Sequence, residues 1–186
     1  MKKGKLFVVS GPSGAGKSTI CKEVGKMIRI KLAISATTRE PRAGEKNKVD
    51  YYFMTKEEYL RRRQNDEFLE TAEVHGNYYG TLKEEVDESL SNGENIILEI
   101  DVQGGLQIKK KYPESKLIFF KTFTEKELEN RLRNRKTEAE DKIMLRLKNS
   151  LEELKHEKEY DITIINNTVE QACSDLIKII ENENMG

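Results

Sequence analysis

Near its start the chain reads Leu6-Phe7-Val8-Val9-Ser10-Gly11-Pro12-Ser13-Gly14-Ala15-Gly16-Lys17-Ser18, an apolar run that leads into a glycine-rich loop. Residues 11–18 fit the pattern G-x-x-x-x-G-K-[ST], whose glycines let backbone N–H groups wrap around a phosphate. The strand-like run before the loop and the helical pattern after it supply the context that this motif requires. A glycine-rich turn that matched by chance would lack that context, so the stretch predicts a phosphate-binding loop between a strand and a helix.

Two side chains of this loop have predicted chemical roles. Lys17 is expected to reach the phosphoryl group that is transferred, and the hydroxyl of Ser18 is expected to ligate Mg²⁺. The positive end of the following helix adds to the attraction for phosphate. The residues predicted to bind the triphosphate, as ATP, are Gly11, Pro12, Ser13, Gly14, Ala15, Gly16, Lys17, Ser18 and Thr19.

Length and composition exclude several classes of protein. The 186 residues fit one compact domain, and Lys+Arg and Asp+Glu both number 33, which argues against a general nucleic-acid or membrane-surface binder. Cys21 and Cys173 lack the pair spacing of zinc or redox motifs, so we expect ordinary core thiols in a reducing cytoplasm. The apolar run at residues 6–9 is too short for a signal peptide, and no stretch approaches transmembrane length.

Short apolar runs alternate along the chain with longer amphipathic stretches, which is typical of an α/β domain. The runs are nearly continuous, as in strands that are buried on both faces of a parallel sheet. Helix starts are predicted at Thr55, Thr124 and Thr168, each followed three residues later by Glu or Gln, and helix ends at Gly93 and Pro113. The predicted core strands are residues 6–10, 33–35, 95–100, 116–120 and 162–165.

Two regions depart from this alternation. Residues 51–54, 68–74 and 78–81 have the pattern of short strands, which predicts a small inserted β-rich lobe. Residues 125–160 form a highly charged helical stretch whose arginines could serve as a lid. We therefore predict a core (residues 1–33, 85–125 and 149–186), an inserted lobe (34–84) and a lid (126–148).

The phosphate-binding loop alone does not separate GTPases, ATPase motors and small-molecule kinases, because all of them share these parts. A GTPase would be expected to carry a guanine-reading N/T-K-x-D motif, and we expect none in this chain. A motor usually needs a larger domain. The rest of the chain must therefore identify the class.

Downstream of the loop, Ser35-Ala36-Thr37-Thr38-Arg39-Glu40-Pro41-Arg42-Ala43-Gly44-Glu45, followed by Asp50-Tyr51-Tyr52-Phe53, resembles the guanylate kinase family. Further matches follow in the family's order at Glu70, at residues 76–81 and 97–104, and at Arg131 with Arg135. The resemblance covers essentially the whole chain. It implies a nucleoside monophosphate kinase of the P-loop fold that transfers the γ-phosphoryl of ATP to GMP or dGMP, giving ADP and GDP from GMP.

The resemblance also implies a role for each matching residue. Those on the phosphate of GMP would be Arg39, Arg42, Tyr51 and Tyr79. Those around its guanine would be Ser35, Glu70, Thr81 and Asp101. Those that neutralise charge during transfer would be Lys17, Arg131, Arg135 and Arg146.

Physical chemistry supports two of these roles independently. Two arginines three residues apart on a proline-stiffened loop can clamp a dianionic phosphate with charge-assisted hydrogen bonds. Guanine presents N1–H and its 2-amino group as adjacent donors, which the carboxylate of Glu70 can accept together. Adenine would turn a lone pair towards that carboxylate, a mismatch that discriminates strongly between substrates.

Other interpretations of the same residues stay open. Arg39 and Arg42 could be solvated loop charges, Glu70 could be the outward residue of an alternating strand, and the arginines of the lid could be an exposed helix face. Asp101 follows a buried strand at its carboxyl end, where α/β sheets place ligands, so a ligand-binding or Mg²⁺-linked role is favoured there. Arg133, His75 and His156 are expected at the surface.

Lys48 and Lys136 depart from the resemblance, because family members commonly carry glycine at both positions. Two rival functions remain. Guanylate-kinase-like interaction modules of scaffold proteins typically lack a complete phosphate-binding loop, and a kinase for another phosphorylated acceptor would have no use for Glu70. Nothing in the sequence indicates an oligomeric state.

Overall fold

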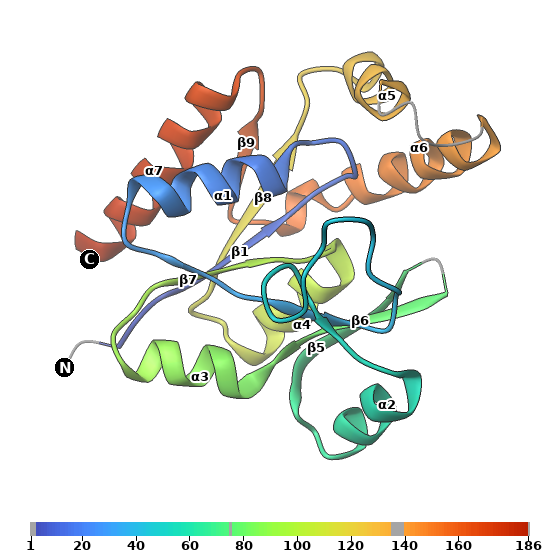
Figure 1. Ribbon diagram of the computed structural model, residues 1–186. Helices are drawn as coiled ribbons and strands as arrows, with labels where there is room; N and C mark the ends of the chain where they lie inside the picture. The colour runs from blue at the N-terminus through green and yellow to red at the C-terminus, as the bar shows by residue number, and fades with distance from the viewer. Residues whose placement is uncertain (1–2, 75, 135–139, 186) are drawn as a thin grey trace.

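The computed structural model describes residues 3–74, 76–134 and 140–185. Its main sheet has five strands in the order β2-β7-β1-β8-β9, and all neighbouring strands run parallel (Figure 1). This arrangement confirms the predicted α/β fold with a parallel central sheet. These strands are β1 (Leu6–Ser10), β2 (Lys31–Leu32), β7 (Ile96–Glu99), β8 (Lys116–Lys121) and β9 (Ile162–Ile165).

Strand β1 runs through the middle of this sheet and is buried along its whole length. Because side chains alternate across a strand, Phe7 and Val9 pack on one face with helices α1 and α7, while Leu6 and Val8 pack on the other with α3 and α4. Two apolar cores thus hold the phosphate-binding loop at the end of a rigid strand. The helices are α1 (Lys17–Met27), α2 (Lys56–Gln64), α3 (Lys83–Ser91), α4 (Val102–Lys111), α5 (Glu125–Arg133), α6 (Glu140–Leu154), α7 (Val169–Met185) and the 3-10 turn η1 (Glu157–Glu159).

A second sheet, with the strand order β4-β3-β6-β5, lies beside the main one (Figure 1). Helix α2 covers it, and the buried ring of Tyr59 stacks on Phe68 at 4.7 Å and on Tyr78 at 5.3 Å between ring centroids. Aromatic stacking therefore supplies the core of this small sheet, which has few aliphatic side chains. Its strands are β3 (Ser35–Thr37), β4 (Tyr52–Phe53), β5 (Phe68–Val74) and β6 (Asn77–Leu82).

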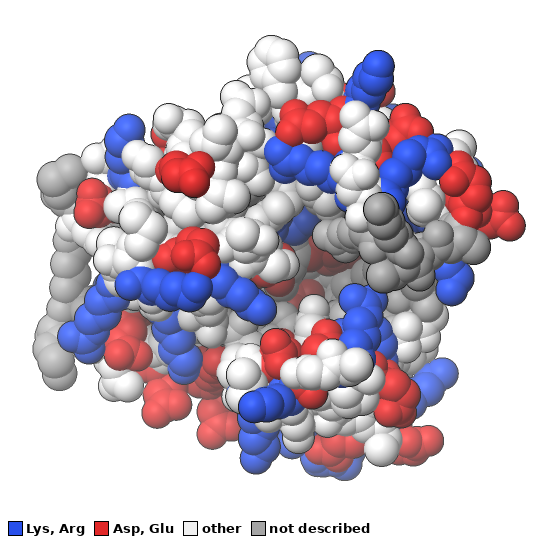
Figure 2. Space-filling model, turned by 45° about the horizontal axis from the view of Figure 1, so that its top comes forward, with Lys and Arg blue, Asp and Glu red and all other residues white. Residues whose placement is uncertain are grey.

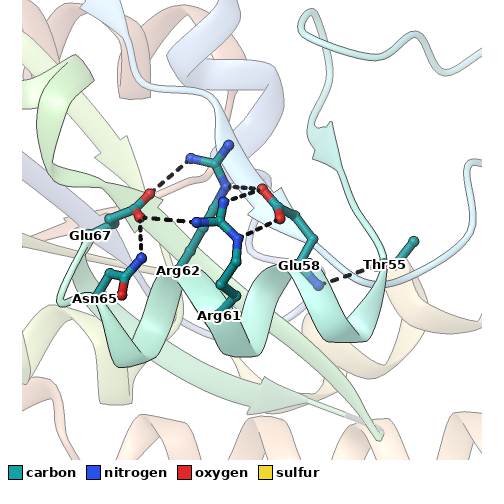
Figure 3. A network of polar contacts seen from close by, with 6 residues as sticks. All are labelled: Thr55, Glu58, Arg61, Arg62, Asn65 and Glu67. Carbon is teal, nitrogen blue, oxygen red and sulfur yellow. Dashed lines mark hydrogen bonds and ion pairs between the residues drawn. The ribbon is translucent and has the colours of Figure 1, made fainter.

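Charged side chains form a network of polar contacts along helix α2 (Figure 3). Thr55 caps it by accepting a hydrogen bond from the N–H of Glu58, and the Glu58 carboxylate bridges Arg61 and Arg62. The hydrogen bonds from these two arginines lower the pKa of Glu58 to about 2, and Arg62 continues the network to Glu67. The network lies on the outside of the molecule and supports the helix.

The structure confirms most of the predicted elements. Thr55, Thr124 and Thr168 each accept a hydrogen bond from the backbone N–H three residues on, and α3 and α4 end just before Gly93 and Pro113. The predicted core strand at 33–35 is wrong: the main sheet takes Lys31–Leu32, while Ser35 already belongs to the second sheet. The chain passes from one sheet to the other within the mostly apolar stretch 30–34, and hydrophobicity does not mark the point where it does so. Among the described residues, no helix is long and apolar enough to cross a membrane.

Candidate active site

A cleft of about 360 Å³ lies between the two sheets, and Figure 2 shows a hollow on this face with basic and acidic side chains inside it. The phosphate-binding loop forms one wall and strands β3, β5 and β6 of the second sheet form the other. Of the residues predicted to bind substrates, those that line it are Gly11, Ser13, Gly14, Gly16, Lys17, Ser18, Thr19, Ser35, Tyr51, Glu70, Tyr79 and Asp101. The structure thus brings residues of the predicted ATP site and residues of the predicted GMP site to a single cleft.

The phosphate-binding loop is held from behind by Asn166, which the sequence analysis did not single out. Its buried side-chain amide donates a hydrogen bond of 2.8 Å to the carbonyl of Ala15. Gly16 has a φ of +87°, and a Cβ there would lie 2.3 Å from this amide nitrogen, so position 16 admits only glycine. The amide satisfies a buried carbonyl and leaves the N–H side of the loop to the cleft.

Lys17 opens helix α1, and its ammonium donates hydrogen bonds to the carbonyls of Gly11 and, at 3.0 Å, Pro12. The side chain therefore curls over the loop at the position where a phosphate would lie. Glu153, from the end of α6, also lines this part of the cleft. Burial raises the pKa of Glu153, while the charge of Lys17 opposes that rise.

Ser18 shows what a metal ion would meet here. Its hydroxyl donates a hydrogen bond of 2.5 Å to the carboxylate of Glu99, the last residue of β7. Among the described residues, no group of three or more His, Cys, Asp or Glu side chains could hold a metal by itself. The Ser18 hydroxyl and the Glu99 carboxylate are hard oxygen groups that suit Mg²⁺ shared with the phosphates of a nucleotide. Glu99 was not predicted, although its place at the carboxyl end of a core strand was the available signal.

Glu70 lies at the far end of the cleft and is only 3% exposed. It accepts a hydrogen bond of 2.8 Å from the hydroxyl of Thr81 on the paired strand. Burial raises the pKa of Glu70 to about 7, and the nearby charge of Asp101 adds to the effect. The alternative that Glu70 is an outward-facing residue of an alternating strand is wrong, because its side chain is buried. A buried carboxylate that lines a cleft can accept hydrogen bonds from a ligand.

Asp101 lies beside Glu70 and also has a structural role that the sequence analysis did not foresee. It is the N-cap of helix α4, and its carboxylate accepts a hydrogen bond of 2.9 Å from the N–H of Gly104. Burial raises its pKa. Ser35 pairs with Thr81 across β3 and β6, which brings this serine to the same end of the cleft.

Arg39 is held by a partner that was not predicted, the carboxylate of Glu45. The two ends of the guanidinium each donate a hydrogen bond of 3.0 Å to one oxygen of Glu45, and the side chain is only 15% exposed. The hydrogen bond raises the pKa of Arg39 and lowers that of Glu45. The guanidinium lies 5.3 Å from the ring centre of Tyr51, so Arg39 is a fixed cation next to a side chain that lines the cleft.

Arg39, Arg42 and Thr81 do not line the cleft. The side chain of Arg42 is exposed, and its backbone N–H donates to Glu45 at 2.7 Å. Thr81 is fully buried behind Glu70.

Of the predicted lid arginines, the two that the structure describes, Arg131 and Arg146, do not line the cleft. Arg131, on α5, donates a hydrogen bond of 2.8 Å to the carbonyl of Asn166 and pairs with Glu127, which brings it beside Gly16. Arg146 is half-buried on α6. Arg135, Lys136 and His75 lie outside the described residues.

The expectation that the chain has no N-K-x-D motif is wrong, because Asn47-Lys48-Val49-Asp50 matches the pattern. The side chain of Asn47 accepts from the N–H of Phe53 at 3.0 Å, and that of Asp50 accepts from the N–H of Lys46 at 2.8 Å. The two polar side chains that would contact a base are therefore bonded within their own loop.

Lys48 in this loop has a φ of +62°, in the left-handed region that favours glycine. We expect Lys48→Gly to raise the free energy of unfolding by up to about 1 kcal/mol, because relief of the steric cost of a side chain there exceeds the added freedom of the unfolded chain. Lys46→Gly is the matched control: it removes the same charge at a neighbouring exposed position without a positive φ and should lower stability. Equilibrium urea unfolding measures both, and a loss of stability in both variants would contradict the prediction.

Comparison with known proteins gives one family. Residues 3–183 match the family model described as guanylate kinase. The chain is 63% identical to a guanylate kinase of Fusobacterium nucleatum over 98% of both chains, and 48% identical to one of Clostridium acetobutylicum over 98% of this chain and 87% of the other. It is also similar to the crystal structure of guanylate kinase from Anaplasma phagocytophilum, with a TM-score of 0.84 and 31% identity over 100% of this chain and 89% of that one.

Proposed function

The chain belongs to the guanylate kinase family, which phosphorylates GMP with ATP, and we propose that it carries out this transfer in the cleft between its two sheets. The observation that carries the proposal is the shared cleft. A phosphate-binding loop and a buried carboxylate, Glu70, face it from opposite walls. One wall suits the triphosphate donor, and the other suits a guanine.

The donor half consists of the phosphate-binding loop and its surroundings. The N–H groups of the loop would hold the phosphates of ATP, while the ammonium of Lys17 would leave the carbonyls of Gly11 and Pro12 for the γ-phosphate. Mg²⁺ would be held by Ser18, with Glu99 behind it, and when bound it would neutralise charge on the donor oxygens. Arg131, Arg135 and Arg146 are proposed to add positive charge when the lid closes.

The acceptor half consists of the second sheet and the loop before β4. Arg39 and Arg42, with Tyr51 and Tyr79, are proposed to hold the phosphate of GMP or dGMP. The carboxylate of Glu70 is proposed to accept from guanine N1–H and the 2-amino group, with Ser35, Thr81 and Asp101 around the base. The pair with Glu45 would keep Arg39 in place before the acceptor arrives.

The proposed reaction is direct transfer between the two bound nucleotides. The acceptor is a phosphate oxygen that already carries negative charge, so no general base is needed. An oxygen of GMP forms the new bond to the γ-phosphorus as the bond to the β-phosphate oxygen of ATP breaks, which leaves GDP and ADP. The protein contributes positioning, charge neutralisation and the exclusion of water as the lobe (34–84) and the lid (126–148) close.

The cellular setting is proposed on two grounds. Both cysteines are buried free thiols, which suits the reducing cytoplasm where ATP and GMP are available. The balanced charge gives no reason to expect nucleic acid or a membrane surface as a partner. The substrates are then the only ligands that the function needs, together with Mg²⁺.

A coupled assay of ADP release tests the proposed function. GMP, dGMP, AMP, CMP and UMP are offered in turn with ATP and Mg²⁺, and turnover is expected with GMP and dGMP. Comparable values of kcat/KM for AMP and GMP would refute the guanine assignment. ADP release without any acceptor would point to hydrolysis rather than transfer.

A further inference from the structure

Helix α4 holds the strand that carries Glu70, and the contact is made by a side chain with no assigned role, Gln107. Its amide nitrogen donates a hydrogen bond of 2.8 Å to the carbonyl of Thr71, and its amide oxygen accepts one of 3.2 Å from the N–H of the same residue. Thr71 follows Glu70 directly on β5. One side chain of the main domain therefore satisfies both backbone groups next to the proposed base-reading residue.

The position of β5 explains why such a contact is needed. Strand β5 is an edge strand of the four-stranded sheet, so only one of its two edges is paired, with β6. The other edge carries N–H and C=O groups that require partners. The primary amide of Gln107 has the same donor and acceptor as a peptide group, and here it takes the place of a neighbouring strand.

Three residues on one face of α4 contact three consecutive residues of β5. Lys111 donates a hydrogen bond to the carbonyl of Leu69, and Gln107 bonds to Thr71. Glu70 lies between Leu69 and Thr71 on β5, and it faces Gly104 of the helix. A Cβ on Gly104 would lie 2.6 Å from a carboxylate oxygen of Glu70, so helix and carboxylate are in close contact. The backbone of β5 is thus fixed on both sides of Glu70.

We propose that Gln107 is a positioning residue for guanine selectivity: through Thr71 it fixes the Glu70 carboxylate against α4, where it meets the base of the acceptor. The proposal rests on the proposed function, since it takes Glu70 as the residue that reads guanine. A carboxylate that accepts two adjacent donors must hold its angle as well as its position, and a strand edge without partners would not hold it. Gln107 itself touches no substrate.

The test compares Gln107→Leu with wild type in kcat and KM for GMP, for inosine monophosphate, which lacks the 2-amino group, and for ATP. We expect KM for GMP to rise about tenfold, the preference for GMP over inosine monophosphate to fall by a similar factor, and KM for ATP to stay within about twofold. Gln171→Leu is the matched control, because it makes the same change in an exposed helical glutamine whose side-chain amide donates to Asp175, on its own helix. This control should keep all the constants of the wild type.

A purely structural role would give a different result. A lowered Tm with an unchanged GMP preference, or an equal rise in KM for GMP and ATP, would overturn the proposal. If Gln107→Leu does not fold, Gln107→Glu replaces it: this variant keeps an acceptor for the Thr71 N–H, loses the donor to its carbonyl, and should show the same selective loss. If the wild-type protein does not turn over GMP, the proposed function is refuted. If the wild type is active and Glu70→Gln loses its preference for GMP while Gln107→Leu keeps it, only the role of Gln107 is refuted.

Discussion

Replacing Lys17 by alanine is expected to lower kcat about a thousandfold while KM for GMP changes less than threefold. The ammonium is the only lysine group that lines the described cleft, and a preorganised charge on the transferring phosphoryl group acts mainly in the transition state. Since the acceptor is held by the other wall, its affinity should be nearly independent of Lys17. Steady-state kinetics with each substrate varied in turn measure the two effects separately.

Lys22→Ala is the matched control, because Lys22 is an exposed lysine on the same helix. Lys17 also bonds to two loop carbonyls, so its loss could loosen the loop. Thermal unfolding of Lys17→Ala with and without ATP separates this effect from the loss of charge. A variant that keeps more than a tenth of the wild-type kcat would contradict the catalytic role.

Glu70→Gln is expected to lower kcat/KM for GMP about a hundredfold and to leave kcat/KM for AMP nearly unchanged. The glutamine amide turns one donor towards the two donors of guanine, and a buried polar mismatch of this kind is costly. Glu73→Gln, at an exposed position of the same strand, is the control. An unchanged preference for GMP over AMP would assign the reading of the base to another residue.

Glu70→Gln is also expected to be more stable than wild type at alkaline pH. A carboxyl group whose pKa is raised by folding stabilises the folded state below its unfolded pKa and loses this contribution as the pH rises through its folded pKa. For Glu70 these values are near 4.5 and about 7, which corresponds to about 3 kcal/mol at pH 8. Wild type and Glu73→Gln should therefore lose stability between pH 5 and 8, whereas Glu70→Gln should not.

Activity towards GMP should rise with pH where stability falls, because ionised Glu70 is the form that accepts hydrogen bonds from guanine. In wild type, kcat/KM for GMP is expected to fall as the pH drops below about 7. The phosphate of GMP also titrates in this range, so Glu70→Gln provides the baseline. Identical pH profiles in the two proteins would contradict a role for ionised Glu70.

Much of the fold could be predicted because its signals are local. Strand β1, the loop and helix α1 are specified by one contiguous stretch, and each capping threonine acts within four residues of its own position. The strand at 33–35 was misplaced because the chain changes sheets inside one apolar run, which hydrophobicity cannot divide. Lengths of apolar runs identify strands, but not the sheets to which they belong.

The candidate site shows a similar limit. Residues with a motif of their own, such as Lys17 and Ser18, could be predicted, and Glu70 required the family resemblance. The sequence did not indicate four residues that support the site, namely Asn166, Glu45, Glu99 and Gln107. Three of them bond to residues far away in the chain, and Glu45 bonds to Arg39 within a loop that has no regular pattern. Contacts of this kind arise from tertiary packing, for which one sequence offers no periodic signal.

The parallel pairing of β1 also has a consequence for the newly made chain. Leu6 pairs with Ile96 and Phe7 with Lys116, so β1 leaves the ribosome before its partners, which are synthesised about 90 to 110 positions later. Closing such long loops is slow, and until then a strongly apolar segment stays uncovered. The phosphate-binding loop thus lacks its supporting sheet until the segments of β7 and β8 have been synthesised.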